Sequence, residues 1–332
     1  MIGHLKARLK RWINARIAEE LDARIAGMDA QTVRRPGSQS APPSALFSIQ
    51  KDTREFETLG PPSEYKKDYP GFMDILESKP GIDAALARDT SPLPVTADRE
   101  GYGDDQHFRY WLGGLRDYLM IRQLLRSKCK VDLTGRVFDL GCASGRVVRH
   151  MAAQEPGLEV WGADINNRHV EWMRRYLPGN IKVFQCTTLP SLPIEDNSMS
   201  LVSAFSVFTH IDEFDLAWLS EIRRILRPGA VAYLTVHSDR TWANMKPDDK
   251  IYRALLDGND WIAEYDVTEK FLSGPMPREK TVFTYNSAAN YNTNVFLSEK
   301  YIRQSWGRLF EVIDIVPEAH AYQDVVLLRK HS

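Results

Sequence analysis

Val137-Phe-Asp-Leu-Gly-Cys-Ala-Ser-Gly-Arg146 is the stretch that decides the fold of this chain. Its first residues are typical of a buried β-strand, and the glycines that follow predict a tight turn into the start of a helix. A carboxylate, Asp164, ends the next apolar run. A strand, a glycine turn and a helix start form a cradle for a nucleotide-type ligand, and a carboxylate after the neighbouring strand is placed to bind ribose hydroxyls.

The spacing of the glycines excludes two common nucleotide sites. A dinucleotide fingerprint needs glycine at the first, third and sixth positions of the turn, where this chain has Gly141, Ala143 and Arg146. A phosphate-binding P-loop ends in Gly-Lys-Ser/Thr, and that sequence does not follow here. Neither a nicotinamide-dependent dehydrogenase nor a P-loop enzyme is therefore predicted.

Further elements follow the cradle in a regular order. Strands are predicted at 158–164 and 181–185. Asn166 or Asn167 can cap the helix after the second strand, because a short polar side chain satisfies free backbone N–H groups there. Pro228 stops the helix before the fifth strand, and Gly229 can take the left-handed conformation.

This order of elements resembles the class I S-adenosylmethionine-dependent methyltransferases, whose first motif has the usual form Asp/Glu-x-Gly-x-Gly-x-Gly. The segments 201–210 and 221–229 resemble the fourth strand and the helix-to-strand-five turn of these enzymes. Ala143 stands at the middle glycine and departs from the motif. The resemblance implies an α/β fold with a doubly wound seven-stranded sheet in the order 3-2-1-4-5-7-6, its last strand antiparallel. The closing hairpin is expected at 309–316 and 323–329. S-adenosylmethionine is the implied cofactor.

The resemblance also implies which residues hold the cofactor, at the carboxyl ends of the strands. Asp164 is expected to bind the ribose hydroxyls, and Arg146 either reaches the cofactor carboxylate or caps the neighbouring loop. The other implied cofactor residues are Asp139, Gly141, Ala143, Gly145, Ile165, Thr187, Thr188, Leu189 and Ser206. No metal ion is implied.

Two histidines are candidate general bases, because an oxygen acceptor gains from a base near the reacting atom. His210 follows the predicted fourth strand and His237 ends the fifth. For each, a structural histidine bonded to the backbone stays the alternative. Tyr102, Tyr110 and Tyr291 are candidate substrate contacts, and packing against the core is the alternative for them.

Composition narrows the function further. The 332 residues carry a formal net charge of −1, so no basic field favours nucleic acid. The three cysteines show no disulfide or Cys-x-x-Cys pattern, which favours a reducing, cytoplasmic setting. The resemblance is to bacterial enzymes that methylate small molecules or glycans, and an oxygen atom is the expected acceptor. A catalytically silent cofactor-binding scaffold or regulatory subunit stays open as the alternative.

The predicted organisation has three parts. Residues 1–34 predict a basic amphipathic helix, whose apolar residues recur every four positions. Such a helix can lie on the inner membrane as a peripheral anchor or dock on a partner protein, and a homo-oligomer is also open. Residues 35–100 predict a Pro-rich linker or arm. The methyltransferase domain is expected at 101–332, with 238–297 as an insertion that covers the substrate.

Overall fold

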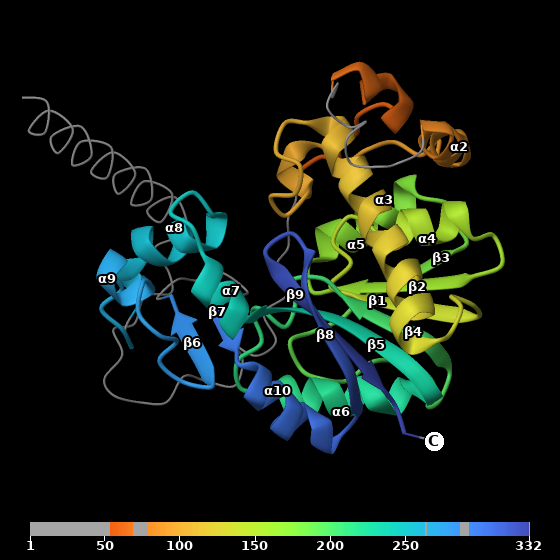
Figure 1. The fold of residues 1–332 in the computed structure, drawn as a ribbon. Coiled ribbons are helices and arrows are strands. Elements are labelled where there is room, and N and C mark those ends of the chain that lie inside the picture. The colour runs from red at the N-terminus through yellow and green to blue at the C-terminus, as the bar shows by residue number, and fades with distance from the viewer. Residues whose placement is uncertain (1–53, 69–78, 263, 286–291, 332) are drawn as a thin grey trace, which may run out of the picture. The chain divides into compact units, whose positions relative to one another are not determined.

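The computed structural model describes residues 54–68, 79–262, 264–285 and 292–331 (Figure 1). The predicted helix over 1–34 and the candidate Tyr291 lie outside the described residues. Among the described residues, no helix is both long and apolar enough to cross a lipid bilayer.

The strands form a mixed sheet in the predicted order. Five parallel strands run in the order β3-β2-β1-β4-β5, and a C-terminal hairpin adds β9 antiparallel to β5, with β8 beside it. This hairpin supplies the two strands expected at 309–316 and 323–329, so the doubly wound order is confirmed. The strands are β1 Arg136–Leu140, β2 Glu159–Asp164, β3 Ile181–Gln185, β4 Met199–Ala204, β5 Leu226–Ser238, β8 Glu311–His320 and β9 Gln323–Arg329.

Helices cover both faces of this sheet because successive strand residues point to opposite sides. Helices α3, α4 and α5 lie over one face and α6 and α10 over the other (Figure 1). Val137 belongs to the buried cluster on the side of α3, α4 and α5, whereas Phe138 belongs to the cluster on the side of α6 and α10. Asn166 caps α5 as predicted, its side chain accepting from the backbone N–H of Arg168. The helices are α3 His107–Leu124, α4 Val148–Gln154, α5 Asn167–Tyr176, α6 Asp215–Ile225 and α10 Glu299–Ser305, with short turns η5 Leu125–Cys129 and η7 Trp306–Arg308.

The segment predicted as an insertion has its own small core. Its strand β7 extends the sheet by pairing in parallel with His237 and Ser238 at the end of β5. Trp242, Phe283 and Phe296 pack together in its interior. The elements are α7 Asp239–Asn244, α8 Lys250–Asp257, η6 Asn259–Trp261, α9 Glu269–Leu272, β6 Lys280–Thr284 and β7 Thr293–Leu297. Much of the aromatic content of the insertion therefore stabilises the insertion itself.

The described part of the predicted arm packs on the sheet domain. It contains η2 Pro62–Asp68, α2 Lys79–Arg88 and η4 Thr96–Asp98. We name residues 94–106 the strap. Arg168 of α5 forms a two-pronged ion pair with Asp98 of the strap, at 2.6 and 3.0 Å, and the Asp98 side chain is almost fully buried. The Ser144 hydroxyl donates to the backbone carbonyl of Asp98. These contacts hold the strap against the glycine turn.

Candidate active site

The glycine turn after β1 needs a left-handed backbone at three positions. Gly141, Ala143 and Gly145 have φ values of +71°, +45° and +82°. A Cβ atom on Gly145 would lie 2.5 Å from Cδ1 of Leu177, just after α5, and 3.0 Å from Sδ of Met173 within it, so a larger residue there would also crowd the end of α5. Ala143 is different, because an L-residue with a Cβ is strained in this conformation. The turn therefore keeps its shape at a local cost in stability.

Ala143→Gly is expected to raise the free energy of unfolding by about 1 kcal/mol or slightly less. Left-handed strain of about 1–2 kcal/mol is removed, and the greater freedom of glycine in the unfolded chain offsets part of the gain. Urea denaturation of both proteins measures the difference. Ala152→Gly, inside α4, is the matched control and should instead lose about 1 kcal/mol. If Ala143→Gly is less stable than the wild type, the inference that Ala143 is strained is wrong.

Asp164 lies at the carboxyl end of β2, beside the turn. One carboxylate oxygen accepts the backbone N–H of Ala143 at 2.8 Å, and the other accepts that of Asn166, also at 2.8 Å. The Nδ1 atom of His169 lies 3.8 Å from the same carboxylate. Burial acts to lower the pKa of His169, but Asp164, Glu100 and Asp98 together raise it. Asp164 is thus fixed in orientation, with lone pairs left for ribose hydroxyls.

One cavity brings together six of the predicted residues. Tyr102 and Tyr110 from the N-terminal side face the turn that carries Asp139, Gly141 and Ala143. The full lining is Arg99, Tyr102, Tyr110, Asp139, Gly141, Cys142, Ala143, Arg146, Val147 and Phe205. The predicted site residues therefore converge from the strap, from α3 and from the turn after β1.

Asp139 lines this cavity and is buried. The Ser203 hydroxyl donates to its carboxylate at 2.6 Å. Burial raises the pKa of Asp139 to about 7, against the weaker opposite effects of Ser203 and Arg146. A buried carboxylate in this position suits a ligand ammonium group, which would stabilise its charged form.

Arg99 is a site residue that sequence reasoning missed. Its guanidinium donates to the carbonyl of Pro94 at 2.8 Å and to that of Asp104 at 3.3 Å, and it contacts Nδ1 of His107 at 3.0 Å. Burial lowers the pKa of Arg99. None of the ion pairs between described residues joins Arg99 to a carboxylate, although it lines the cavity. Its Cζ also lies 4.8 Å from the centre of the Tyr110 ring. A buried cation that no carboxylate neutralises can hold a ligand carboxylate.

Arg146, whose role the sequence left open, is committed to another partner. Its guanidinium pairs with the buried carboxylate of Asp117 on α3, and its Cζ lies 4.1 Å from the centre of the Tyr102 ring. Burial acts to lower the pKa of Arg146, but the charge of Asp117 raises it. Arg146 therefore connects α3, the turn and the strap.

The charged side chains in and beside the cavity match the predicted cofactor in chemistry: Asp139 and Arg99 line the cavity, whereas Asp164 lies beside the glycine turn and outside the lining. Asp139 suits the ammonium group of its methionine half, Arg99 suits the carboxylate, and Asp164 suits the ribose hydroxyls. The residues predicted to contact the adenine ring do not line the cavity. Thr187 and Thr188 are exposed after β3, and these two, Leu189 and Ile165 are not part of the cavity lining. Their role stays a prediction.

The affinity for S-adenosylhomocysteine is expected to rise with pH up to about 7 and then level off. Asp139 has a folded-state pKa of about 7, above its usual 3.8, so a neutral acid must lose its proton before it binds an ammonium group. Below pH 7 the affinity should fall by up to tenfold per unit. The same shift makes folding stability fall as pH rises from about 4 to 7, because the folded state holds the extra proton.

Calorimetric titration between pH 5.5 and 8.5, in buffers of different ionisation enthalpy, measures both the affinity and the proton released. Asp139 faces Asp164 and Asp117 as well as Arg146, and His169 titrates beside Asp164. Asp139→Asn should therefore bind weakly but without the slope. If the affinity of Asp139→Asn still rises with pH, the pH dependence belongs to His169.

A cluster of hydrogen-bonding side chains borders the cavity beyond β4. Ser206 has a φ of +55°, and its N–H donates to the Thr235 hydroxyl at 2.7 Å. Its hydroxyl lies 2.8 Å from the hydroxyl of Tyr102 and accepts from the amide of Gln323 at 3.0 Å. The strained backbone of Ser206 is the kind that persists where neighbouring contacts hold it, often at functional sites.

The two candidate bases occupy different surroundings. Nδ1 of His210 contacts the carbonyl of Thr293 at 2.6 Å, and burial lowers the pKa of its ring. His237 stacks against Tyr322 and Phe296, and burial lowers its pKa to about 3. An imidazole with such a pKa is a weak base at neutral pH. Both assignments stay predictions, and neither histidine is part of the cavity lining.

Comparison with known proteins bears on this site. A family model described as a methyltransferase domain matches residues 137–229, which contain the turn, Asp164 and Ser206. No curated protein matches the chain.

Solved structures with similar folds have low identity to this chain. A methyltransferase from Methanosarcina mazei is 18% identical over 60% of this chain and 94% of its own, with a TM-score of 0.41. The 1,6-didemethyltoxoflavin-N1-methyltransferase of Burkholderia thailandensis, solved with S-adenosylhomocysteine, is 14% identical over 77% and 92%, with a TM-score of 0.42. Similarity at this level bears on neither the substrate nor the catalytic residues.

Proposed function

This chain carries a class I S-adenosylmethionine-dependent methyltransferase domain, and from that premise we propose that it methylates an oxygen atom of a glycan or small metabolite. The observation that carries the proposal is the hydroxyl cluster at the cavity, where Tyr102 and Ser206 lie 2.8 Å apart. An oxygen acceptor must lose a proton, and hydroxyl and imidazole groups are suited to accept it.

The residues of the site have separable tasks. The bound cofactor supplies an activated methyl group on a positively charged sulfur, so the protein mainly has to align the acceptor. Asp164 and Arg99 would fix the two ends of the cofactor, and Asp139 its ammonium group. The strap, held by Asp98, lies against the turn and would shield the bound cofactor from water.

Three features of the chain narrow the class of molecule that can accept the methyl group. Enzymes that methylate exocyclic nitrogens often carry Asn/Asp-Pro-Pro-aromatic after strand four, where this chain has Ser206-Val-Phe-Thr. Net charge near zero disfavours a nucleic acid. In the insertion, Trp261 is 58% exposed and available for stacking on a sugar ring. These features favour a small, uncharged acceptor.

Radiolabelled methyl transfer tests the proposal. Purified protein is incubated with methyl-labelled cofactor and a panel of monosaccharides, phenols and amines, after calorimetry has shown binding of S-adenosylhomocysteine. Label on an oxygen acceptor supports the proposal, and label only on amines contradicts it. Binding without transfer to any acceptor would favour the silent scaffold.

We also propose where in the cell the protein acts and what its N-terminal residues contact. The cysteine pattern favours the cytoplasm of a bacterium, and the basic sequence of residues 1–34 favours contact with an anionic membrane surface or a partner protein. Sedimentation with and without anionic vesicles, comparing the full chain with one that begins at residue 46, distinguishes membrane contact from contact with a protein.

A further inference from the structure

We propose that Asp117, His320 and Tyr102 form a proton relay that removes the proton from the acceptor hydroxyl. The inference rests on the proposed function, since only an acceptor that carries a proton needs the relay. Tyr102 is the catalytic residue because it lines the cavity. His320 and Asp117 act through it and are positioning residues.

The three side chains contact one another in sequence and come from three distant parts of the chain. Oδ1 of Asp117, on α3, is 3.0 Å from Nδ1 of His320, at the end of β8. Nε2 of His320 is 3.4 Å from the hydroxyl of Tyr102, in the strap. That hydroxyl also reaches Ser206 at the edge of the cavity. A carboxylate, an imidazole and a phenol thus lead from the core to the cavity.

The charges along this line suit proton transfer. Asp117 and His320 are both buried, so their interaction is little screened by water. Burial acts to raise the pKa of Asp117, but His320 and Arg146 hold it well below its usual range. A permanently charged Asp117 favours a proton on Nδ1 of His320, which leaves Nε2 as an acceptor. The guanidinium of Arg146 over the Tyr102 ring compensates negative charge on the phenol oxygen.

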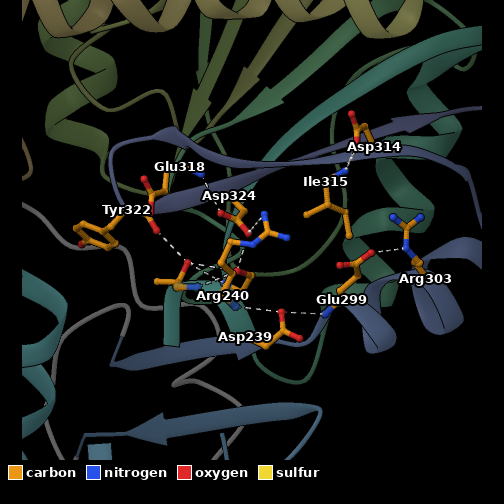
Figure 2. A network of polar contacts seen from close by, with 11 residues as sticks. Asp239, Arg240, Glu299, Arg303, Asp314, Ile315, Glu318, Tyr322 and Asp324 are labelled. Carbon is orange, nitrogen blue, oxygen red and sulfur yellow. Dashed lines mark hydrogen bonds and ion pairs between the residues drawn. The ribbon is translucent and has the colours of Figure 1, made fainter. Parts of the chain in front are cut away.

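The hairpin that carries His320 is anchored from the other side. Figure 2 shows Asp324 of β9 accepting from the backbone N–H of Glu318 at 2.9 Å, with Arg240 beside it at 3.8 Å. Asp324 also accepts the Ser238 hydroxyl at 2.7 Å. The carbonyl of Tyr322 accepts from Thr241 of α7 at 2.9 Å. These contacts fix both strands of the hairpin tip, and so hold the imidazole in position.

The proton steps balance without another reactant. The acceptor O–H gives its proton to the phenol oxygen of Tyr102 as the phenol proton passes to Nε2 of His320. The acceptor oxygen receives the methyl group in place of its proton. His320 is then a cation whose Nδ1–H donates to Asp117, and its extra proton leaves for water once the products have gone.

Nitrogen NMR of histidine-labelled protein tests the relay without an acceptor. Neutral His320 is expected to carry its proton on Nδ1, with Nε2 accepting from Tyr102. Tyr102→Phe should shift the Nε2 resonance of His320, and Asp117→Asn should move part of the population to the other tautomer. Tyr285→Phe, which removes a hydroxyl bonded to the Ala254 carbonyl in the insertion, is the control and should change neither. A proton on Nε2 in the wild type, or no response to Tyr102→Phe, would overturn the relay.

Kinetics with the oxygen acceptor from the labelling panel give the second readout. Tyr102→Phe should lower kcat by about 10²–10⁴-fold, as expected for loss of general acid–base catalysis, and should leave the affinity for S-adenosylhomocysteine within about threefold. An unchanged kcat would also overturn the relay. Absence of S-adenosylhomocysteine binding by the wild type would instead defeat the proposed function, so the two failures are distinguishable.

Discussion

Asp164→Ala is expected to weaken the binding of S-adenosylhomocysteine by at least 100-fold. The carboxylate would lose its hydrogen bonds to both ribose hydroxyls, each worth about 1.5–3 kcal/mol when the acceptor is charged. It would also release the N–H of Ala143, which Asp164 holds at 2.8 Å in the glycine turn. Titration calorimetry of the purified variant measures the loss.

Two variants make this result specific. Asp164→Asn keeps the shape and one accepting oxygen, so it should bind more weakly than the wild type and more tightly than Asp164→Ala. Asp132→Ala removes an exposed carboxylate that pairs with Arg126, and it should bind as the wild type does. Wild-type affinity in Asp164→Ala would show that another residue binds the ribose hydroxyls.

Asp98→Ala is expected to lower the free energy of unfolding by about 3–5 kcal/mol. The change leaves the guanidinium of Arg168 buried without its carboxylate, and breaking a buried pair from one side costs about this much. It should also loosen the strap, because Arg168 of α5 would no longer hold it. Urea denaturation measures the stability, and proteolysis within residues 94–106 reports the strap.

The exposed pair Arg126–Asp132 is the matched comparison for this effect. Its 2.7 Å contact is as short as that of Arg168 with Asp98, but both side chains are more than half exposed. Asp132→Ala should therefore cost less than about 1 kcal/mol. A loss of similar size in both variants would mean that burial does not set the strength of the strap contact.

Local patterns explain why the sequence predicted the sheet and the glycine turn. The order of the strands follows from apolar runs and turn residues, and Asp139, Gly141 and Ala143 are neighbours along the chain. Asp164 was found because it lies one strand away at a regular spacing. The sequence also singled out Ala143 as a departure from the motif, and the structure shows that its φ is positive.

The remaining features depend on contacts that no local pattern encodes. His320 meets Asp117 across 203 residues and Tyr102 across 218. The sequence patterns pointed to histidines at the ends of the fourth and fifth strands as candidate bases, and they did not single out His320. Arg99 shows no periodicity or motif and becomes notable only once it is buried at the cavity. The pairing of β7 with β5 likewise depends on the return of a long insertion.

The late position of the closing hairpin has a consequence for synthesis of the protein. β9 pairs with β5 from Val231 to Val236, and it is the last strand of the described sheet to leave the ribosome. Until then β5, whose interior is almost wholly apolar, presents an unpaired edge that can join another chain. The docking of the β8–β9 hairpin on β5 also brings His320 to Tyr102. A nascent chain can therefore form its glycine turn early. It gains the proton relay only when β9 has paired with β5, and the same pairing covers the edge that is prone to aggregate.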